Sequence, residues 1–351
     1  MSQAVIDHFE EQAGFCEAMG SPFTARLLTA MARDLAAGGP TAALVAGWPG
    51  SPRADAVSLR LAGALHAAAL SGRDPELAAA YPAARATPDG DAAWEAARAF
   101  LARDSEWVSD FLRHPPQTNE VNRSIALFAA FLHVARRFPD LPFDMLEIGA
   151  SAGLNLHWDR FAYRTESWTW GRQSAAPIET RWSGPPPALD ARPIVRSRAA
   201  CDRNPLDVRD PDDRLRLRAY IWPDQRDRLA RLDAAIAIAV ANDVRVERAD
   251  AAEWLEDRLA RRAQDGVAIV YHSVFYQYPS RETRHRIRAA IERAGASSSA
   301  PLAWVRLEPE AILGGPRDSI GFLVDVVTWP GGERRTLART DGHVRAIEAT
   351  G

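Results

Sequence analysis

The first part of the chain has the spacing of packed helices. Apolar residues recur every three to four positions between Pro and Gly breaks, as at Phe23, Leu27 and Met31. From this spacing we expect helices near residues 4–19, 22–37, 54–70, 74–80, 91–103, 105–113 and 119–138. Residues 1–138 are therefore predicted to form an all-α cap domain.

The second part, residues 139–351, alternates short apolar runs with helical segments. We expect strands at 143–148, 194–200, 244–248, 267–271 and 302–307, with helices between them. This alternation predicts an α/β fold with a doubly wound, mostly parallel sheet. Two further strands flank Pro330-Gly331-Gly332, a pattern that predicts an antiparallel hairpin at the C-terminal end.

An insertion at about residues 161–192 interrupts the alternation and is rich in tryptophan. Trp168, Trp170 and Trp182 lie close together there, and the alternation at 168–170 suggests a small hairpin. Tryptophans in this arrangement either stack on a substrate or fasten the insertion to the core, and general aromatic burial favours the second interpretation.

Composition narrows the class of protein. The 351 residues carry a net charge of −3, which argues against nucleic acid and polybasic membrane binding. The longest apolar run, residues 234–241, is far below the ~20 residues needed to span a bilayer. Two distant cysteines form no disulfide framework, and the first residues lack a signal-peptide pattern. We therefore expect a cytoplasmic protein that binds neither nucleic acid nor a membrane surface.

The stretch that begins at the first strand of the expected sheet carries the strongest chemical signal. Glu147 ends an apolar strand, and Gly149 and Gly153 bracket a turn that leads into a helix. A dinucleotide site requires two further glycines, and a P-loop requires Gly-Lys-Ser/Thr, neither of which is present. S-adenosylmethionine has no phosphate, so it is the ligand class that fits this turn. Carboxylates at the ends of this strand and the next would serve its ammonium and ribose.

A polar segment, residues 114–124, precedes this strand. Thr118 or Asn119 is a candidate helix cap. The segment is either a capped loop or a polar loop that overhangs the turn, and polar loops on a rigid scaffold commonly form binding sites.

Three motifs resemble those of class I S-adenosylmethionine-dependent methyltransferases, which have a Rossmann-like fold. Residues 146–153 resemble the first motif, Cys201-Asp202 with Asn204-Pro205 the acidic second motif, and Asp250-Ala251 the third. The hairpin about Pro330 suits the reversed last strand of that fold.

Over roughly residues 5–345, the chain resembles the DUF2332 family of uncharacterised bacterial proteins. The segments that carry this resemblance are residues 116–120, 146–160, 201–205, 222–225, 272–278 and 329–333. The resemblance implies a fold, and through the superfamily it implies a ligand. The residues after the fourth strand lack the Asn/Asp-Pro-Pro-Tyr of amino methyltransferases, which argues further against a nucleic-acid substrate.

These resemblances imply roles for individual residues. The implied cofactor-binding residues are Glu147 for the methionine ammonium, Gly149, Ala150, Ser151 and Gly153 for close backbone approach, Asp202 for the ribose, Asp250 and Ala251 for the adenine, and Ser273. The candidate catalytic residues are His272 as general base and Tyr276. The candidate substrate-binding residues are Gln117, Asn119, Glu120, Arg123 and Gln277.

Several of these residues have an alternative structural role. Glu147 can bond only to backbone, Asp202 can cap the turn that follows it, and His272 can be a buried structural histidine. The other histidines considered, His114, His133, His157 and His285, show no metal-ligand spacing, so no metal is expected.

The leading hypothesis is a small-molecule methyltransferase that uses S-adenosylmethionine. The alternative is a non-catalytic protein that keeps the fold for binding or regulation. A nucleotide-cofactor oxidoreductase is a weaker third hypothesis, because the second glycine of its fingerprint is absent.

Overall fold

The computed structural model describes residues 3–82, 90–172, 177–297 and 299–350. The chain forms two compact units. A helical unit comprises residues 1–118 and 210–230, and a sheet unit comprises residues 119–209 and 231–351. The sequence pattern places the boundary at residue 138 instead. In the structure, residues 119–138 belong to the sheet unit, and a later segment returns to the helical unit.

The described part of the helical unit is built from helices. They are α1 (Gln3–Ala18), α2 (Pro22–Ala36), α3 (Pro40–Val45), α4 (Val57–Ser71), α5 (Pro75–Ala80), α6 (Gly90–Arg103), α7 (Ser105–Leu112), α9 (Pro211–Ala219) and the first residues of α10 (Arg226–Val240). Their apolar stripes form one core, which also buries Tyr220 and Trp222 from the returning segment. The expected helices of this unit are present within a few residues of their predicted ends, and α3 is an addition.

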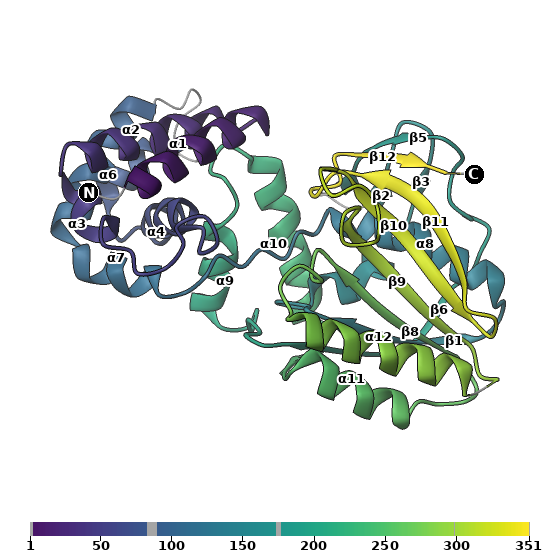
Figure 1. Ribbon diagram of the computed structural model, residues 1–351. Coiled ribbons are helices and arrows are strands. Elements are labelled where there is room, and N and C mark those ends of the chain that lie inside the picture. The colour runs from purple at the N-terminus through teal and green to yellow at the C-terminus, as the bar shows by residue number, and fades with distance from the viewer. Residues whose placement is uncertain (1–2, 83–89, 173–176, 298, 351) are drawn as a thin grey trace. The chain divides into compact units, whose positions relative to one another are not determined.

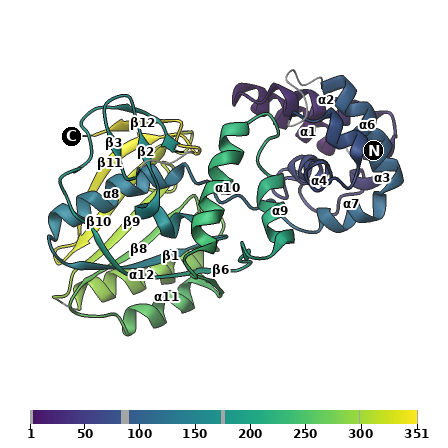
Figure 2. The same ribbon diagram turned by 180° about the vertical axis from the view of Figure 1, so that it is seen from behind.

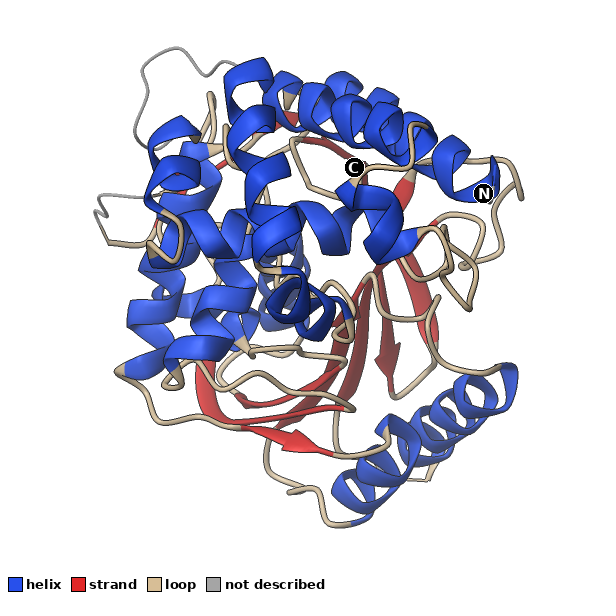
Figure 3. Ribbon diagram, turned by 90° about the vertical axis from the view of Figure 1, so that its left-hand side faces the viewer, coloured by secondary structure: helices blue, strands red, loops and turns tan. Residues whose placement is uncertain are grey.

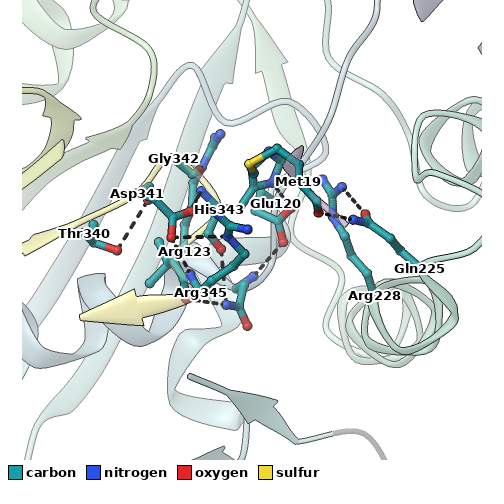
Figure 4. Close-up of polar contacts among 12 residues, drawn as sticks. Met19, Glu120, Arg123, Gln225, Arg228, Thr340, Asp341, Gly342, His343 and Arg345 are labelled. Carbon is teal, nitrogen blue, oxygen red and sulfur yellow. Dashed lines mark hydrogen bonds and ion pairs between the residues drawn. The ribbon is translucent and has the colours of Figure 1, made fainter. Parts of the chain in front are cut away.

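Asp224 joins the returning segment to the start of α2. Its carboxylate accepts a hydrogen bond from the Phe23 amide at 3.0 Å and another from the Ser21 hydroxyl. Gln225 donates to the Met19 carbonyl at 3.5 Å and accepts from Arg228 (Figure 4). The Trp-Pro-Asp-Gln segment at 222–225 therefore has a structural role inside the helical unit.

The sheet unit contains one large sheet and one small sheet. Its elements are α8 (Arg123–Arg137), β1 (Pro142–Ile148), the 3-10 helix η1 (Leu154–Arg160), β2 (Tyr163–Arg164), β3 (Thr169–Trp170), β4 (Ile178–Glu179), β5 (Arg181–Ser183), β6 (Ile194–Asp202), β7 (Val246–Arg248), α11 (Ala251–Ala260), β8 (Val267–Ser273), α12 (Arg281–Ala296), β9 (Leu302–Pro309), β10 (Phe322–Trp329), β11 (Glu333–Thr340) and β12 (Ala346–Ala349).

The large sheet has nine strands in the order β5-β12-β11-β10-β9-β8-β1-β6-β7. Strands β7, β6, β1, β8 and β9 run parallel, and β10 pairs antiparallel with β9 and with β11. Figure 3 shows these strands in red as one curved sheet. The predicted α/β class, the mostly parallel sheet and the C-terminal hairpin are confirmed.

Helices cover both faces of the large sheet. Helices α11 and α12 lie on one face, and α8 lies on the other (Figures 1 and 2). Because side chains alternate along a strand, Leu146 and Ile148 of β1 pack into the core with α11 and α12. Glu147 points to the opposite face, where its neighbour on β8 is Tyr271.

The tryptophan-rich insertion forms the small sheet, in the order β3-β2-β4. Phe128 of α8 stacks on Tyr163 at 4.5 Å between ring centroids and contacts Trp170 at 4.6 Å. These contacts support the interpretation that the aromatic residues fasten the insertion to the core. Residues 173–176 of the insertion lie outside the described residues.

We searched the described ranges for helices that could span a membrane and for clusters of metal-binding side chains. None of the helices there is long and apolar enough to cross a membrane. Nor do these ranges contain a group of three or more His, Cys, Asp or Glu side chains that could hold a metal ion.

Candidate functional site

The strand order places a switch point between β1 and β8. The chain adds β6 and β7 on one side of β1, and then adds β8 and β9 on the other side. Ligands of open α/β sheets bind beyond the carboxyl ends of the strands at such a point. The segments that leave β1 and β8 therefore define the candidate site.

The glycine turn after β1 is held by the end of β6. The amides of Gly149 and Ala150 both donate to the carbonyl of Cys201, at 2.9 and 3.1 Å. The Ser151 amide donates to Oδ2 of Asp202 at 2.8 Å, and Oδ1 of Asp202 accepts from the Asn204 amide at 2.8 Å. Asp202 thus caps two turns at once, as its structural interpretation predicts. Each of its oxygens keeps a second lone pair for a ligand donor.

Positive φ angles allow the turn to close tightly. Gly149, Ser151 and Gly153 have φ of 69°, 55° and 72°. A Cβ added to Gly149 would lie 2.1 Å from Cδ2 of Phe275, and one added to Gly153 would lie 2.8 Å from Val246. Close approach therefore explains both glycines, but side chains of this unit occupy the space beside them.

Glu147 is a buried carboxyl at the switch point. It is 2% exposed, and the Tyr271 hydroxyl donates to its Oε2 at 3.2 Å. Burial raises the pKa of Glu147 to about 8, and the nearby charge of Asp202 acts in the same direction, against the Tyr271 hydrogen bond. The carboxyl is therefore mostly neutral at pH 7 and becomes ionised where a cation is bound beside it.

The polar segment before α8 contacts the turn directly. Oδ1 of Asn119 accepts from the Leu154 amide at 2.9 Å, and Nδ2 of Asn155 donates to the Glu120 carbonyl at 3.4 Å. Both contacts fall where the turn enters η1. The segment therefore borders the turn, as the sequence hypothesis of an overhanging loop predicts for Asn119 and Glu120.

Glu120 and Arg123 also reach the turn between β11 and β12. Glu120 Oε2 lies 3.3 Å from Nδ1 of His343, and Arg123 Nε donates to the Gly342 carbonyl at 3.1 Å (Figure 4). Sequence reasoning missed His343; the only local signal is a polar Asp-Gly-His turn after a strand. The remaining substrate candidate of this stretch, Gln117, lies in a coil of the helical unit.

His272 is fully enclosed. Its side chain is 0% exposed and stacks on the Tyr276 ring, with 4.7 Å between centroids. The Trp304 indole N–H donates to Nε2 at 3.2 Å, so Nδ1 carries the hydrogen and donates to Glu308 Oε1 at 2.6 Å. A general base needs a nitrogen that is open to a proton, and neither ring nitrogen meets this requirement here. The geometry thus gives His272 a structural role.

Tyr276 is also engaged within the fold. Its hydroxyl donates to the Arg284 carbonyl at 3.1 Å, and burial raises its pKa to about 12. The phenol therefore stays protonated at neutral pH. Nearby, Ser273 is half-buried at the end of β8, and Gln277 is exposed in the loop that follows.

Glu308 organises the loop after β8, and sequence reasoning missed it. Besides His272, its Oε1 accepts from the Phe275 amide at 2.8 Å and the Tyr276 amide at 3.1 Å. Val274, just before them, has a φ of 53°, which is rare for a β-branched residue. Glu308 thereby fixes the loop that places the Phe275 ring against Gly149.

Asp250 caps α11. Its Oδ1 accepts from the Ala252 amide at 2.9 Å, and Oδ2 lies 3.7 Å from the Arg203 guanidinium. Ala251, the first residue of the helix, is buried. The carboxyl ends of β1, β6 and β7 thus bring Glu147, Asp202 and Asp250 to one edge of the sheet.

Several buried side-chain oxygens near the glycine turn lack a hydrogen-bond partner among the described residues. They are Ser151 Oγ, Asn155 Oδ1 and Asn122 Oδ1. Buried polar atoms are nearly always bonded, so these oxygens indicate an environment suited to a ligand that donates hydrogen bonds.

A family model described as an uncharacterised protein conserved in bacteria, DUF2332, matches residues 6–349. No curated protein and no solved structure matches the chain. Since the family match covers nearly all of the 351 residues, the chain belongs to the DUF2332 family.

Proposed function

We propose that this protein is an S-adenosylmethionine-dependent methyltransferase that acts on a small molecule. The observation that carries the proposal is Glu147, a 2% exposed carboxyl with a pKa raised to about 8, beside the glycine turn at the switch point. A cationic ligand bound there would stabilise the carboxylate and be stabilised by it. S-adenosylmethionine, which carries a sulfonium and an ammonium, has the required charge and no phosphate.

The other carboxylates at this edge of the sheet fit the remainder of the ligand. Asp202 uses one lone pair of each oxygen for the turns it caps, so the second lone pairs are available for a ribose diol. The unpartnered oxygens of Ser151 and Asn155 would accept from the ammonium or from bridging water. When bound, the cofactor supplies a methyl group on a positively charged sulfur, while these residues bind and orient it.

The Phe275 ring limits how closely a ligand can approach the glycine turn. It lies against Gly149, where a ligand would otherwise approach the backbone. In the proposed complex the ring forms a wall of the site, where an aromatic face would also attract a sulfonium.

A non-catalytic binding protein is the second candidate. The specific observation in its favour is that His272 and Tyr276, the two catalytic candidates of the sequence, are both bonded inside the fold. Methyl transfer, however, depends mainly on the alignment of acceptor, methyl and sulfonium, so the loss of these two candidates does not exclude it.

Isothermal titration with S-adenosylmethionine and with S-adenosylhomocysteine tests the proposal. We expect both to bind the wild-type chain, and Glu147→Gln to weaken the binding of both, because both carry the ammonium that Glu147 would face. Glu348→Gln, at an exposed carboxylate of β12, is the matched control. Absence of heat up to high micromolar ligand in a folded sample contradicts the proposal. Binding without transfer of a labelled methyl group to any component of a bacterial extract favours the non-catalytic candidate.

A further inference from the structure

Two loops at the carboxyl edge of the large sheet carry the most exposed large apolar side chains of the described residues. Strands β8 and β9 run parallel and lie side by side (Figure 1), so the loops at residues 274–280 and 310–321 leave the sheet at the edge where β1 ends. Tyr278 in the first loop is 75% exposed, and Ile320 in the second loop is 94% exposed. Water therefore surrounds two large side chains of types that are commonly buried at least in part.

The backbone of the second loop is fixed on both sides of Ile320. The Glu310 amide donates to the Gly321 carbonyl at 2.9 Å, and this hydrogen bond closes the base of the loop. The Ser319 hydroxyl donates to Glu310 Oε2 at 2.7 Å, and the Gly321 amide donates to Ser319 Oγ at 3.2 Å. A compact loop that is closed by its own contacts is frequently functional. This loop holds Ile320 in place, although the side chain itself is almost fully solvated.

The first loop connects this surface to the glycine turn. The Tyr278 amide donates to the Phe275 carbonyl at 3.0 Å, so a tight turn joins these two residues. The Phe275 ring in turn lies against Gly149. Glu308 accepts from the Phe275 amide, and Glu310, which closes the second loop, follows Glu308 on the same segment of chain. The two exposed side chains therefore continue the wall that Phe275 forms beside the candidate cofactor site.

The polar and apolar groups of this site lie beyond different strands. Glu147 and Asp202 lie at the ends of β1 and β6, whereas the loops beyond β8 and β9 carry Phe275, Tyr278 and Ile320. Ligand sites are commonly lined by apolar and aromatic side chains, with a few polar groups that fix the orientation of the ligand. In the proposed function the carboxyls serve the cofactor, so the apolar surface is left for the molecule that receives the methyl group.

We propose that the methyl acceptor is a small molecule with a large apolar group, which Tyr278 and Ile320 cover in the complex. This inference rests on the proposed methyltransferase function. The tyrosine ring packs on the apolar group from one loop, and the isoleucine packs on it from the other. The exposed polar side chains of the same two loops form the rim of this subsite; they are Gln277, Arg317 and Asp318.

Partitioning of the methylated product tests the class of acceptor. Wild-type protein is incubated with methyl-labelled S-adenosylmethionine and a methanol extract of bacterial metabolites, and the products are then shaken with ethyl acetate. We expect the labelled product in the organic phase, since S-adenosylmethionine itself stays in the aqueous phase.

Variants of the two exposed residues test the subsite itself. Tyr278→Ser and Ile320→Ser should each raise the amount of extract that gives half the maximal rate by about tenfold, because one apolar contact is lost. Both variants should bind S-adenosylmethionine as the wild type does. The matched control is Ile194→Ser, which should change neither quantity. Ile194 is 52% exposed and begins β6, so it lies at the opposite edge of the same sheet.

A second measurement needs no acceptor. N-phenyl-1-naphthylamine is a neutral apolar molecule whose fluorescence rises when it leaves water. With S-adenosylhomocysteine present, we expect it to bind the wild type, and the double variant Tyr278→Ser with Ile320→Ser to bind it at least about tenfold more weakly.

The outcomes separate this inference from the proposed function. Absence of cofactor binding in the wild type, or binding without any methyl transfer, overturns the proposed function and this inference with it. If transfer occurs, a labelled product that stays in the aqueous phase, or equal affinity of the wild type and the double variant for N-phenyl-1-naphthylamine, overturns this inference alone. Sedimentation that shows a wild-type dimer which the double variant dissociates also overturns it, because the surface is then a subunit interface.

Discussion

The hydroxyl of Tyr271 on β8 donates a hydrogen bond at 3.2 Å to the carboxyl of Glu147 on β1. Phe131 of α8 packs edge-on against the tyrosine ring, and neither member of the pair is open to bulk water. Burial raises the pKa of Glu147 to about 8 and that of Tyr271 well above its ordinary value. On the same face, the charged groups near the pair are Asp202, Arg198 and Asp159. A cation bound to Glu147 must therefore displace a proton at neutral pH.

The first prediction is that binding of S-adenosylmethionine releases a proton. The affinity should rise with pH, by up to about tenfold per pH unit, until it levels off as Glu147 ionises near pH 8. Glu147→Gln should flatten this dependence, and the exposed control Glu348→Gln should keep it. Titration calorimetry in buffers of different ionisation enthalpy measures the proton directly. Equal wild-type affinity on both sides of neutrality contradicts the prediction.

The second prediction compares two glycines with the same backbone φ of 69°. A Cβ at Gly149 would meet the Phe275 ring at 2.1 Å, whereas a Cβ at Gly72 meets nothing within 4 Å. We expect Gly72→Ala to cost about 1 kcal/mol of unfolding free energy from backbone strain, and Gly149→Ala to cost about 3 kcal/mol.

Chemical denaturation measures both costs. The double variant Gly149→Ala with Phe275→Ala should recover part of the difference, because it removes the clashing ring. If Gly149→Ala costs no more than Gly72→Ala, the ring does not occupy the position seen beside the turn.

The third prediction concerns Glu308. Replacing it with alanine removes the acceptor of His272 Nδ1 and of the Phe275 and Tyr276 amides. Leaving buried donors unsatisfied should cost about 3 kcal/mol or more of unfolding free energy. Glu282→Ala, at an exposed position of α12, should change stability by less than about 0.5 kcal/mol. Equal stability of the two variants contradicts the structural role of Glu308.

Local pattern was sufficient for the elements whose signal lies within one segment. The apolar run and glycine turn at 145–153 predicted β1 and its turn, and Pro330-Gly331-Gly332 predicted the β10–β11 hairpin. The same pattern could not assign residues 210–230, because an amphipathic helix does not specify which core buries it. The side chains of Tyr220 and Trp222 are buried in the core of the helical unit, and the residues that form this core lie far away in the chain.

The candidate site likewise contains residues that local pattern identifies and residues whose role depends on the fold. Glu147 and Asp202 could be found because each follows a strand signal directly. The position of His272 at the end of a strand predicts a general base. Its partners Glu308 and Trp304 lie on β9, and only the register of β8 against β9 brings them to the ring. His343 is more than 200 residues from Glu120, so the contact between these two side chains is visible only in the folded chain.

The fourth prediction is a loss of stability at acidic pH caused by His157. Its side chain is 1% exposed, and Nδ1 has no partner among the described residues. Burial and the charge of Arg198 lower its pKa from 6.5 to about 4. As the pH falls from 6.5 to about 4, the unfolded chain therefore binds a proton that the folded chain does not, and the free energy of unfolding decreases. Above pH 6.5 the ring is neutral in both states and this loss is absent. Below that pH, the decrease in the free energy of unfolding amounts to at most about 3 kcal/mol.

His157→Gln removes this titration, so the variant should lose less stability than the wild type between neutral pH and about pH 4.5. His66 has a pKa lowered to about 4 by burial and continues to titrate in the variant, so part of the acid sensitivity should remain. Glu147 acts with the opposite sign, because its raised pKa reduces stability as the pH rises towards 8. Urea unfolding of both proteins at matched pH isolates the His157 contribution, and parallel pH profiles would show that His157 is protonated inside the fold.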